Sequence, residues 1–285
     1  MKKERLDKLL VDRGLVESRQ KAQALIMAGL VTSGGERLEK PGRLIAADLP
    51  IAVEKPLPYV GRGGLKLEEA LDVFKIEVEG RVCADIGSST GGFTDCLLKR
   101  GAAKVYAVDV DIRQLDARLR ADARVVTLEK NARYLEPADL AEAPSLIVMD
   151  VSFISVLKVM PALMRIMRIL GDTIPISGFP GDKKGETGIV SPILLSLVKP
   201  QFEADKGRVG KKGLVRDPEV HRSVLAAVAR GAGDLGFRLH GLVRCSTRGQ
   251  KGNQEFFALW SLAGEPPSEA DVKAWIDDAM RDPSE

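Results

Sequence analysis

The sequence predicts an α/β protein: a doubly wound, mostly parallel sheet with an antiparallel edge hairpin, preceded by a small α+β module. Three observations predict it. From residue 63 onward, short apolar runs alternate with helical patterns, which is typical of parallel strands joined by crossover helices. The last two strand-like runs follow each other without a helix, as antiparallel neighbours do. The first 55 residues instead contain two short helical patterns and short strands.

Residues 1–55 are expected to form the N-terminal module. RLDKLLVDRG has apolar residues at helical spacing, and Ser18 is placed to cap a second helix, SRQKAQALIMAG. A hairpin around Gly34 and Gly35 and a strand in LPIAVEKP complete the module. The prolines of KPLPY indicate that residues 56–62 are a linker.

Residues 63–263 are expected to form the main domain, with seven strands. The helix GLKLEEALDVF precedes four apolar runs, RVCADIG, KVYAVDV, RVVTLEK and SLIVMDVSF. The amphipathic helix SVLKVMPALMRIMRIL comes before the fifth strand, PILLSLVKPQF, and DPEVHRSVLAAVARGAGDLG is the next helix. GFRLHGLVRCS and NQEFFALWSL form the closing hairpin.

Two segments depart from this alternation. Residues 171–192 are rich in Gly and Pro and have no periodic pattern, so they are expected to be a loop insertion, either a functional lid or a disordered segment. Residues 264–285 are expected to be an acidic C-terminal tail, with one short helix from Ser268.

Composition indicates a soluble globular protein. Of the 285 residues, 45% are hydrophobic and 29% are charged. No apolar run is long enough to span a bilayer, and the N-terminus lacks the apolar core of a signal peptide, so we expect a cytoplasmic protein without stable membrane association. Three scattered cysteines and two histidines without metal-ligand spacing predict neither a disulfide framework nor a metal site.

The stretch ADIGSSTGGFTD joins an apolar strand to a helix. Gly87, Gly91 and Gly92 let the main chain approach a ligand, and the helix that starts near Phe93 offers free N–H groups to an anion. The next strand ends in Asp109, about 20 residues further on, where a carboxylate suits ribose hydroxyls. The pattern is neither a P-loop nor an ordinary dinucleotide fingerprint. It suits S-adenosylmethionine, which carries a carboxylate and a ribose, although a plain strand–turn–helix corner has the same pattern.

Four charged residues lie in or next to the predicted apolar elements of the main domain. Asp150 ends the strand of SLIVMDVSF and Lys199 ends the strand of LLSLVKPQFE, although a desolvated charge needs a partner. Lys66 lies on the helix that precedes the sheet, and Glu255 lies just before the final strand. Each residue alone is typical of a surface ion pair. At least two of the four share the edge of the sheet that holds the glycine turn, which predicts a site there.

These motifs resemble those of a known family. Lys66, Asp150, Lys199 and Glu255 follow the order of the K-D-K-E tetrad of FtsJ/RrmJ-like RNA 2′-O-methyltransferases, and RLDKLL…SRQKAQALI resembles the ribosomal protein S4-like RNA-binding domain. With GRGG, DIGSSTGGFTDCLL, MDVSFIS, LVKPQFE and GNQEFF, nearly the whole chain resembles the TlyA family of rRNA 2′-O-methyltransferases, which are often labelled haemolysins. The resemblance implies a Rossmann-like methyltransferase sheet, S-adenosylmethionine as the cofactor, and ribosomal RNA or ribosomal subunits as partners.

The resemblance also implies roles for individual residues. Lys199 is the candidate base or hydroxyl orienter, Lys66 the candidate for stabilising negative charge on the oxygen, and the two carboxylates position the ammonium groups. Asp109 is expected at the ribose of the cofactor and Asn131 at its adenine. The full set of expected cofactor-binding residues is Asp85, Gly87, Ser88, Gly91, Gly92, Phe93, Asp109 and Asn131. The 171–192 insertion departs from the family pattern, so the resemblance does not determine the shape of the rim of the site or the choice of substrate.

The positive charge of the chain is concentrated in its N-terminal fifth. Residues 1–55 contain 11 Lys/Arg and 8 Asp/Glu, which accounts for the whole net charge of +3. Solvated helix faces can produce such an excess, but it is also where a nucleic-acid contact is expected. The candidate RNA-binding residues are Arg5, Lys8, Arg19 and Lys21.

Two other classes of function compete with the methyltransferase. A non-catalytic RNA-binding protein on the same fold has no need of the tetrad and the glycine turn. A membrane-lytic haemolysin needs a secretion signal, a spanning segment or a strongly apolar amphipathic face, and the sequence has none of them. The sequence therefore favours the methyltransferase and leaves open the modified nucleotide, the ribosomal subunit, the proton acceptor and the oligomeric state.

Overall fold

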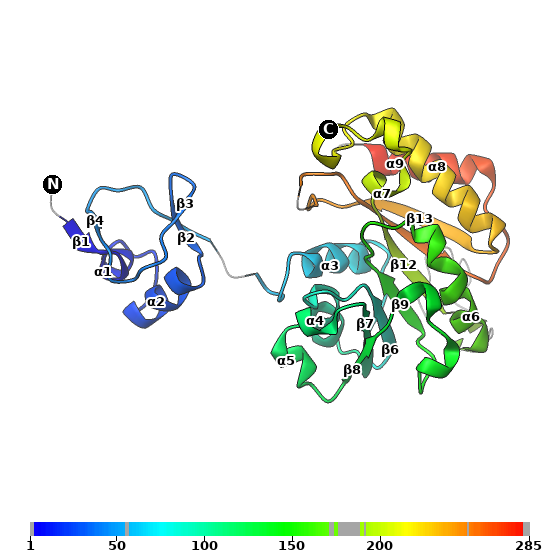
Figure 1. Cartoon of the computed structure of the whole chain (residues 1–285), viewed down its shortest axis with the longest axis horizontal. Coiled ribbons are helices and arrows are strands. Elements are labelled where there is room, and N and C mark those ends of the chain that lie inside the picture. Colours follow the sequence, from blue (N-terminus) through cyan, green and yellow to red (C-terminus); the bar gives the residue numbers. More distant parts are fainter. Residues whose placement is uncertain are drawn as a thin grey trace. The chain divides into compact units, whose positions relative to one another are not determined.

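The computed structural model describes residues 3–54, 57–170, 174–175, 189–190, 192–249 and 251–281. The chain divides into two compact units, Met1–Pro58 and Tyr59–Glu285 (Figure 1). The division falls inside residues 56–62, the segment expected to be the linker. Each unit has hydrophobic core clusters of its own. Most of the expected insertion at 171–192 and the last residues of the expected tail lie outside the described residues.

The first unit contains two helices and short antiparallel strands. Its elements are β1 (Lys3–Arg5), α1 (Leu6–Asp12), α2 (Arg19–Met27), β2 (Val31–Ser33), β3 (Glu36–Arg37), β4 (Leu44–Ala46) and β5 (Ala52–Val53). β1 pairs with β4, and β2 lies between β3 and β5. Ser18 caps α2 as expected, because its hydroxyl accepts a hydrogen bond from the Lys21 N–H at 3.2 Å. The strand β1 was not expected, since three residues are too few to display an alternating pattern.

The second unit is built on the expected seven-stranded sheet, in the order β13-β14-β12-β9-β6-β7-β8. The strands are β6 (Val82–Ile86), β7 (Lys104–Asp109), β8 (Val125–Glu129), β9 (Leu146–Met149), β12 (Ile193–Val198), β13 (Arg238–Arg244) and β14 (Phe256–Ser261). β12, β9, β6, β7 and β8 are parallel, whereas β14 is antiparallel to both β12 and β13. The doubly wound sheet with an antiparallel edge hairpin is therefore confirmed.

Helices cover both faces of this sheet (Figure 1). α3 and α4 pack on one face together with α5, and α6, α8 and α9 pack on the other. The helices are α3 (Gly63–Val73), α4 (Gly92–Lys99), α5 (Ala117–Arg120), α6 (Met160–Leu170), α7 (Pro200–Glu203), α8 (Pro218–Asp234) and α9 (Glu269–Met280). α9 starts with a capping box at Ser268, where the tail helix was expected. Within the described ranges, no helix combines the length and the apolar character that crossing a membrane requires.

Short elements connect these helices and strands. The 3₁₀ turns are η1 (Ile112–Gln114), η2 (Ala132–Tyr134), η3 (Pro137–Asp139), η4 (Val156–Lys158), η5 (Lys206–Arg208) and η6 (Lys211–Gly213). Inside the expected insertion, β10 (Ile174–Pro175) pairs antiparallel with β11 (Ile189–Val190), which the sequence did not predict. Two residues carry too little pattern to be recognised as a strand.

The strand order explains how charges distant in the chain reach one place. β6, β9 and β12 are adjacent and parallel, so their carboxyl ends lie at the same edge of the sheet. β14 runs in the opposite direction beside β12, and its first residue therefore lies at that same edge. Residues that follow β9 and β12 and residues that precede β14 thus come together.

Candidate active site

The four charged residues singled out from the sequence line one cavity of about 530 Å³. Lys66 comes from α3, Asp150 follows β9, Lys199 follows β12, and Glu255 precedes β14. The cavity wall also includes part of the glycine turn between β6 and α4. The tetrad and the turn therefore belong to the same site.

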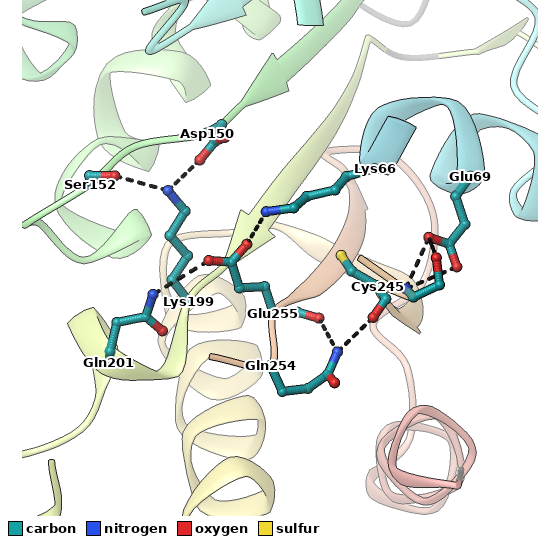
Figure 2. Close-up of polar contacts among 10 residues, drawn as sticks. Lys66, Glu69, Asp150, Ser152, Lys199, Gln201, Cys245, Gln254 and Glu255 are labelled. Carbon is teal, nitrogen blue, oxygen red and sulfur yellow. Dashed lines mark hydrogen bonds and ion pairs between the residues drawn. The ribbon is translucent and has the colours of Figure 1, made fainter. Parts of the chain in front are cut away.

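Lys199 forms the first of two lysine–carboxylate pairs. Its Nζ lies 2.5 Å from Asp150 Oδ1 and donates a hydrogen bond to Ser152 Oγ at 2.9 Å (Figure 2). The Lys199 side chain is 10% exposed and the Asp150 side chain 24%, so the pair is only partly desolvated. Ser152 was not among the candidate site residues singled out from the sequence. Ser152 follows Asp150, the residue at the end of β9, by two positions, and this spacing could have indicated that its side chain also reaches Lys199.

Lys66 and Glu255 form the second pair, which is more deeply buried. Lys66 Nζ lies 2.5 Å from Glu255 Oε2, and Gln201 Nε2 donates to Glu255 Oε1 at 3.4 Å (Figure 2). A buried charge is tolerated when a partner of opposite sign and further hydrogen bonds compensate it. Gln201 was not singled out from the sequence, although it follows Lys199 by two residues in the KPQFE motif.

A hydrogen-bond network fixes the start of β14 beside Glu255. Asn253 Nδ2 donates to Gly213 O, and its Oδ1 accepts from Val215 N–H, both at 2.9 Å. His221 Nε2 lies 3.1 Å from Val215 O, so this histidine belongs to the same network. Burial lowers the pKa of His221. The loop that contains Gly213 lines the cavity, and the network therefore links one wall of the cavity to Glu255.

The glycine turn passes directly beside Asp150. Gly87 has φ +86°, and a Cβ at this position would lie 2.4 Å from the Asp150 carbonyl oxygen. Gly91 has φ +97°, and a Cβ there would lie 2.3 Å from Leu119 Cδ1. Both positions therefore require glycine, for the left-handed backbone and for the close contact. Ser88 is buried on the cavity wall, and its hydroxyl has no hydrogen-bond partner among the described residues.

Asp85 lies behind the turn and not on the cavity wall. It is fully buried, and its Oδ2 accepts hydrogen bonds from Thr94 N–H at 2.9 Å and Thr94 Oγ1 at 2.6 Å. Burial is the main cause that raises the pKa of Asp85 to about 7. The structure thus gives Asp85 a place inside the strand–turn–helix corner, where it fixes the first turn of α4.

The other expected cofactor-binding residues divide into two groups. Gly87, Ser88, Gly92 and Phe93 line the cavity, whereas Gly91, Asp109 and Asn131 do not. The Asp109 carboxylate accepts hydrogen bonds from Ser89 N–H at 2.8 Å and from Asp111 N–H at 3.0 Å, so it supports the turn from the next strand. Asn131 is exposed and accepts a hydrogen bond from the Arg133 N–H at 3.1 Å.

The expected RNA-binding residues all lie in the first unit. Lys8 and Lys21 are exposed. Arg5 and Arg19 are half-exposed and both bind the buried carboxylate of Asp7. Asp7 was not singled out from the sequence. Across the ranges that the structure describes, no three His, Cys, Asp or Glu residues gather as a metal site.

Comparison with known proteins agrees with this geometry. Residues 59–261 match the FtsJ-like methyltransferase family, and residues 4–48 match the S4 domain. A Bacillus subtilis protein named as a candidate rRNA methyltransferase, YqxC, is 46% identical over 267 residues, which cover 93% of this chain and 88% of that protein. The 16S/23S rRNA (cytidine-2′-O)-methyltransferase TlyA of Mycobacterium tuberculosis is 42% identical over 90% of this chain and 88% of its own.

A solved structure gives the same result. The protein from Streptococcus thermophilus, named as a candidate hemolysin, is 40% identical, with a TM-score of 0.67 over 98% of this chain and 96% of its own. The fold and the site therefore define an FtsJ-like methyltransferase with an S4 domain before it. The chain belongs to the TlyA family.

Proposed function

We propose that this protein transfers the methyl group of S-adenosylmethionine to a ribose 2′-hydroxyl of ribosomal RNA, in the cytoplasm. The observation that carries the proposal is the presence of two lysine–carboxylate pairs on the wall of the cavity that contains the glycine turn. The names of the relatives from Bacillus subtilis and Mycobacterium tuberculosis support ribosomal RNA as the substrate class.

The residues around the glycine turn fit this cofactor. Gly87 and Gly92 bring the main chain to the cavity wall, and the N–H groups of Gly92 and Phe93 at the start of α4 have no partner within the helix, which favours a carboxylate. The buried Ser88 hydroxyl, without a partner in the described chain, is a polar group that a bound ligand would satisfy. When bound, S-adenosylmethionine supplies an electrophilic methyl group.

The two lysines are placed to act on the hydroxyl. A ribose hydroxyl is a weak nucleophile, and it attacks only when its oxygen is held in line and its proton passes to an acceptor, which is water when both lysines are ammonium ions. Lys199 Nζ forms an ion pair with Asp150 and donates a hydrogen bond to Ser152, so at least one of its three N–H groups is left for the ribose oxygen. Lys66, held by Glu255, adds a second positive charge near the oxygen. Both ammonium groups stabilise negative charge as it develops there.

The test is methyl transfer to ribosomal subunits from cells that lack this gene. Purified full-length protein and radiolabelled S-adenosylmethionine should label the rRNA, and mass spectrometry of the digested nucleosides should find the methyl group on ribose and not on a base. Absence of label, or label on a base only, would contradict the proposed function.

Lys199→Ala tests the site. We expect it to keep the fold and the affinity for S-adenosylmethionine, measured by calorimetry, and to lower the transfer rate at least about a hundredfold. Lys273→Ala is the matched control, because Lys273 is exposed on α9 and does not line the cavity. A near wild-type rate for Lys199→Ala would show that the catalytic assignment is wrong.

A further inference from the structure

The carboxylate of Asp7 is fully buried in the N-terminal unit and is surrounded by N–H donors. The Arg5 guanidinium donates from Nε to Oδ1 at 3.0 Å and from Nη2 to Oδ2 at 2.9 Å. Arg19 Nε and Gln23 Nε2 each donate to Oδ2 at 2.9 Å. The hydrogen bond from Arg5 is the main cause that holds the pKa of Asp7 well below its usual range. Asp7 is thus a buried anion shared by two arginines.

The two arginines keep contact with solvent. Their side chains are 45% and 55% exposed, whereas that of Asp7 is 0% exposed. Arg5 also lies over Gly42, where a Cβ would be 3.3 Å from its Nη1. The loop around Gly42 is fixed to α1, because two N–H groups at the start of this helix donate to carbonyls of the loop. The guanidinium of Arg5 is therefore held by its carboxylate partner and by the loop beneath it.

We propose that Asp7 is a positioning residue for RNA binding. Its carboxylate holds Arg5 and Arg19 side by side, and the two guanidinium groups form a binding site for the phosphate groups of the RNA backbone. The inference rests on the proposed function, because ribosomal RNA supplies the phosphates. A guanidinium matches the geometry of phosphate oxygens with parallel N–H groups, and most of the N–H groups of this pair are left for such a contact. Side chains that are already fixed lose less rotamer freedom on binding.

The sign of the charge makes this inference testable. Asp7 carries a negative charge between two cations, so on simple electrostatics its removal should strengthen the binding of a polyanion. If Asp7 acts by positioning the arginines, its removal should weaken the binding instead. The two accounts therefore predict changes in opposite directions for one substitution.

The experiment measures the binding of full-length Asp7→Asn to purified ribosomal subunits over a range of salt concentrations. We expect the affinity to fall roughly tenfold, although the chain gains positive charge. Asp12→Asn is the matched control, because Asp12 is exposed at the end of the same helix and the substitution adds the same charge. Asp12→Asn should bind as tightly as wild type or more tightly. If Asp7→Asn binds as tightly as Asp12→Asn, the inference is overturned.

A double-mutant cycle separates positioning from a loss of fold. Arg5→Lys with Arg19→Lys keeps the charge of the surface and removes the guanidinium geometry. Asp7→Asn should have little further effect in this background, because the groups that it positions are gone. If Asp7→Asn causes the same loss with or without the arginines, Asp7 only stabilises the unit, and the inference is wrong.

The result also distinguishes this inference from the proposed function. If wild-type protein fails to methylate ribosomal RNA while the Asp7 effect on RNA binding is present, the proposed function fails and the inference stands. If methylation occurs and Asp7→Asn and Asp12→Asn bind alike, the function stands and the inference fails.

Discussion

Replacing Asp85 with Asn should remove much of the loss of stability that the second unit suffers as the pH rises from 5 to 8.5. Asp85 is fully buried, its Oδ1 has no hydrogen-bond partner among the described residues, and burial raises its pKa to about 7. The folded protein therefore binds this proton more tightly than the unfolded chain does. The stability that Asp85 contributes is fully present below the pKa of an unfolded Asp and is lost as the pH rises through about 7.

The size of the effect follows from this pKa. Between pH 5 and pH 8.5 the wild-type protein should lose roughly 2–3 kcal/mol of unfolding free energy through Asp85, at 1.36 kcal/mol per pH unit up to the folded pKa. Asp85→Asn removes this dependence. Its amide oxygen can still accept from Thr94, whereas its NH₂ group has no obvious acceptor, which costs about 1–3 kcal/mol at every pH. The constant cost cancels when the two pH values are compared.

The assay is urea unfolding at pH 5 and pH 8.5, followed by tryptophan fluorescence. Both tryptophans, Trp260 and Trp275, belong to the second unit, so the signal reports on the unit that contains Asp85. Asp122→Asn is the control, because the hydrogen bond from Arg124 lowers the pKa of Asp122 to about 2. Its contribution changes mainly below about pH 5 and should be almost constant over this range. If Asp85→Asn and wild type lose stability in parallel, the buried ionisation of Asp85 is refuted.

Two further predictions concern the turn and the N-terminal unit. Gly87→Ala should destabilise the protein by about 2–4 kcal/mol and weaken S-adenosylmethionine binding, because its Cβ would meet the Asp150 carbonyl. Gly80→Ala is the control, because Gly80 also has a positive φ but no atom lies within 4 Å of the position of its Cβ. Equal urea midpoints for Gly87→Ala and Gly80→Ala would contradict the clash. Deleting residues 1–55 should leave cofactor affinity, measured by calorimetry, almost unchanged, and it should sharply reduce rRNA binding and its salt dependence. A well-folded truncation that methylates rRNA with unchanged efficiency would disprove the anchoring role.

The sequence by itself determined the class of fold and the edge of the sheet where the site lies. Alternation of apolar runs and helical patterns predicts parallel strands, because each buried strand needs helices over both faces. The cap at Ser18 could also be predicted, since capping depends on a few neighbouring residues. Such local requirements can be read in one stretch of chain.

The tertiary structure alone decided which charges meet. Lys66 pairs with Glu255, 189 residues away, because β14 lies antiparallel between β12 and β13 and brings its first residue to the edge where β12 ends. Pairing depends on strand order, which hydrophobic periodicity does not encode. The same reason applies to Asp7, whose polar side chain predicts a surface position. Its burial follows from the packing of α1 and α2, which brings the donors of Arg19 and Gln23 to a carboxylate at the start of the other helix.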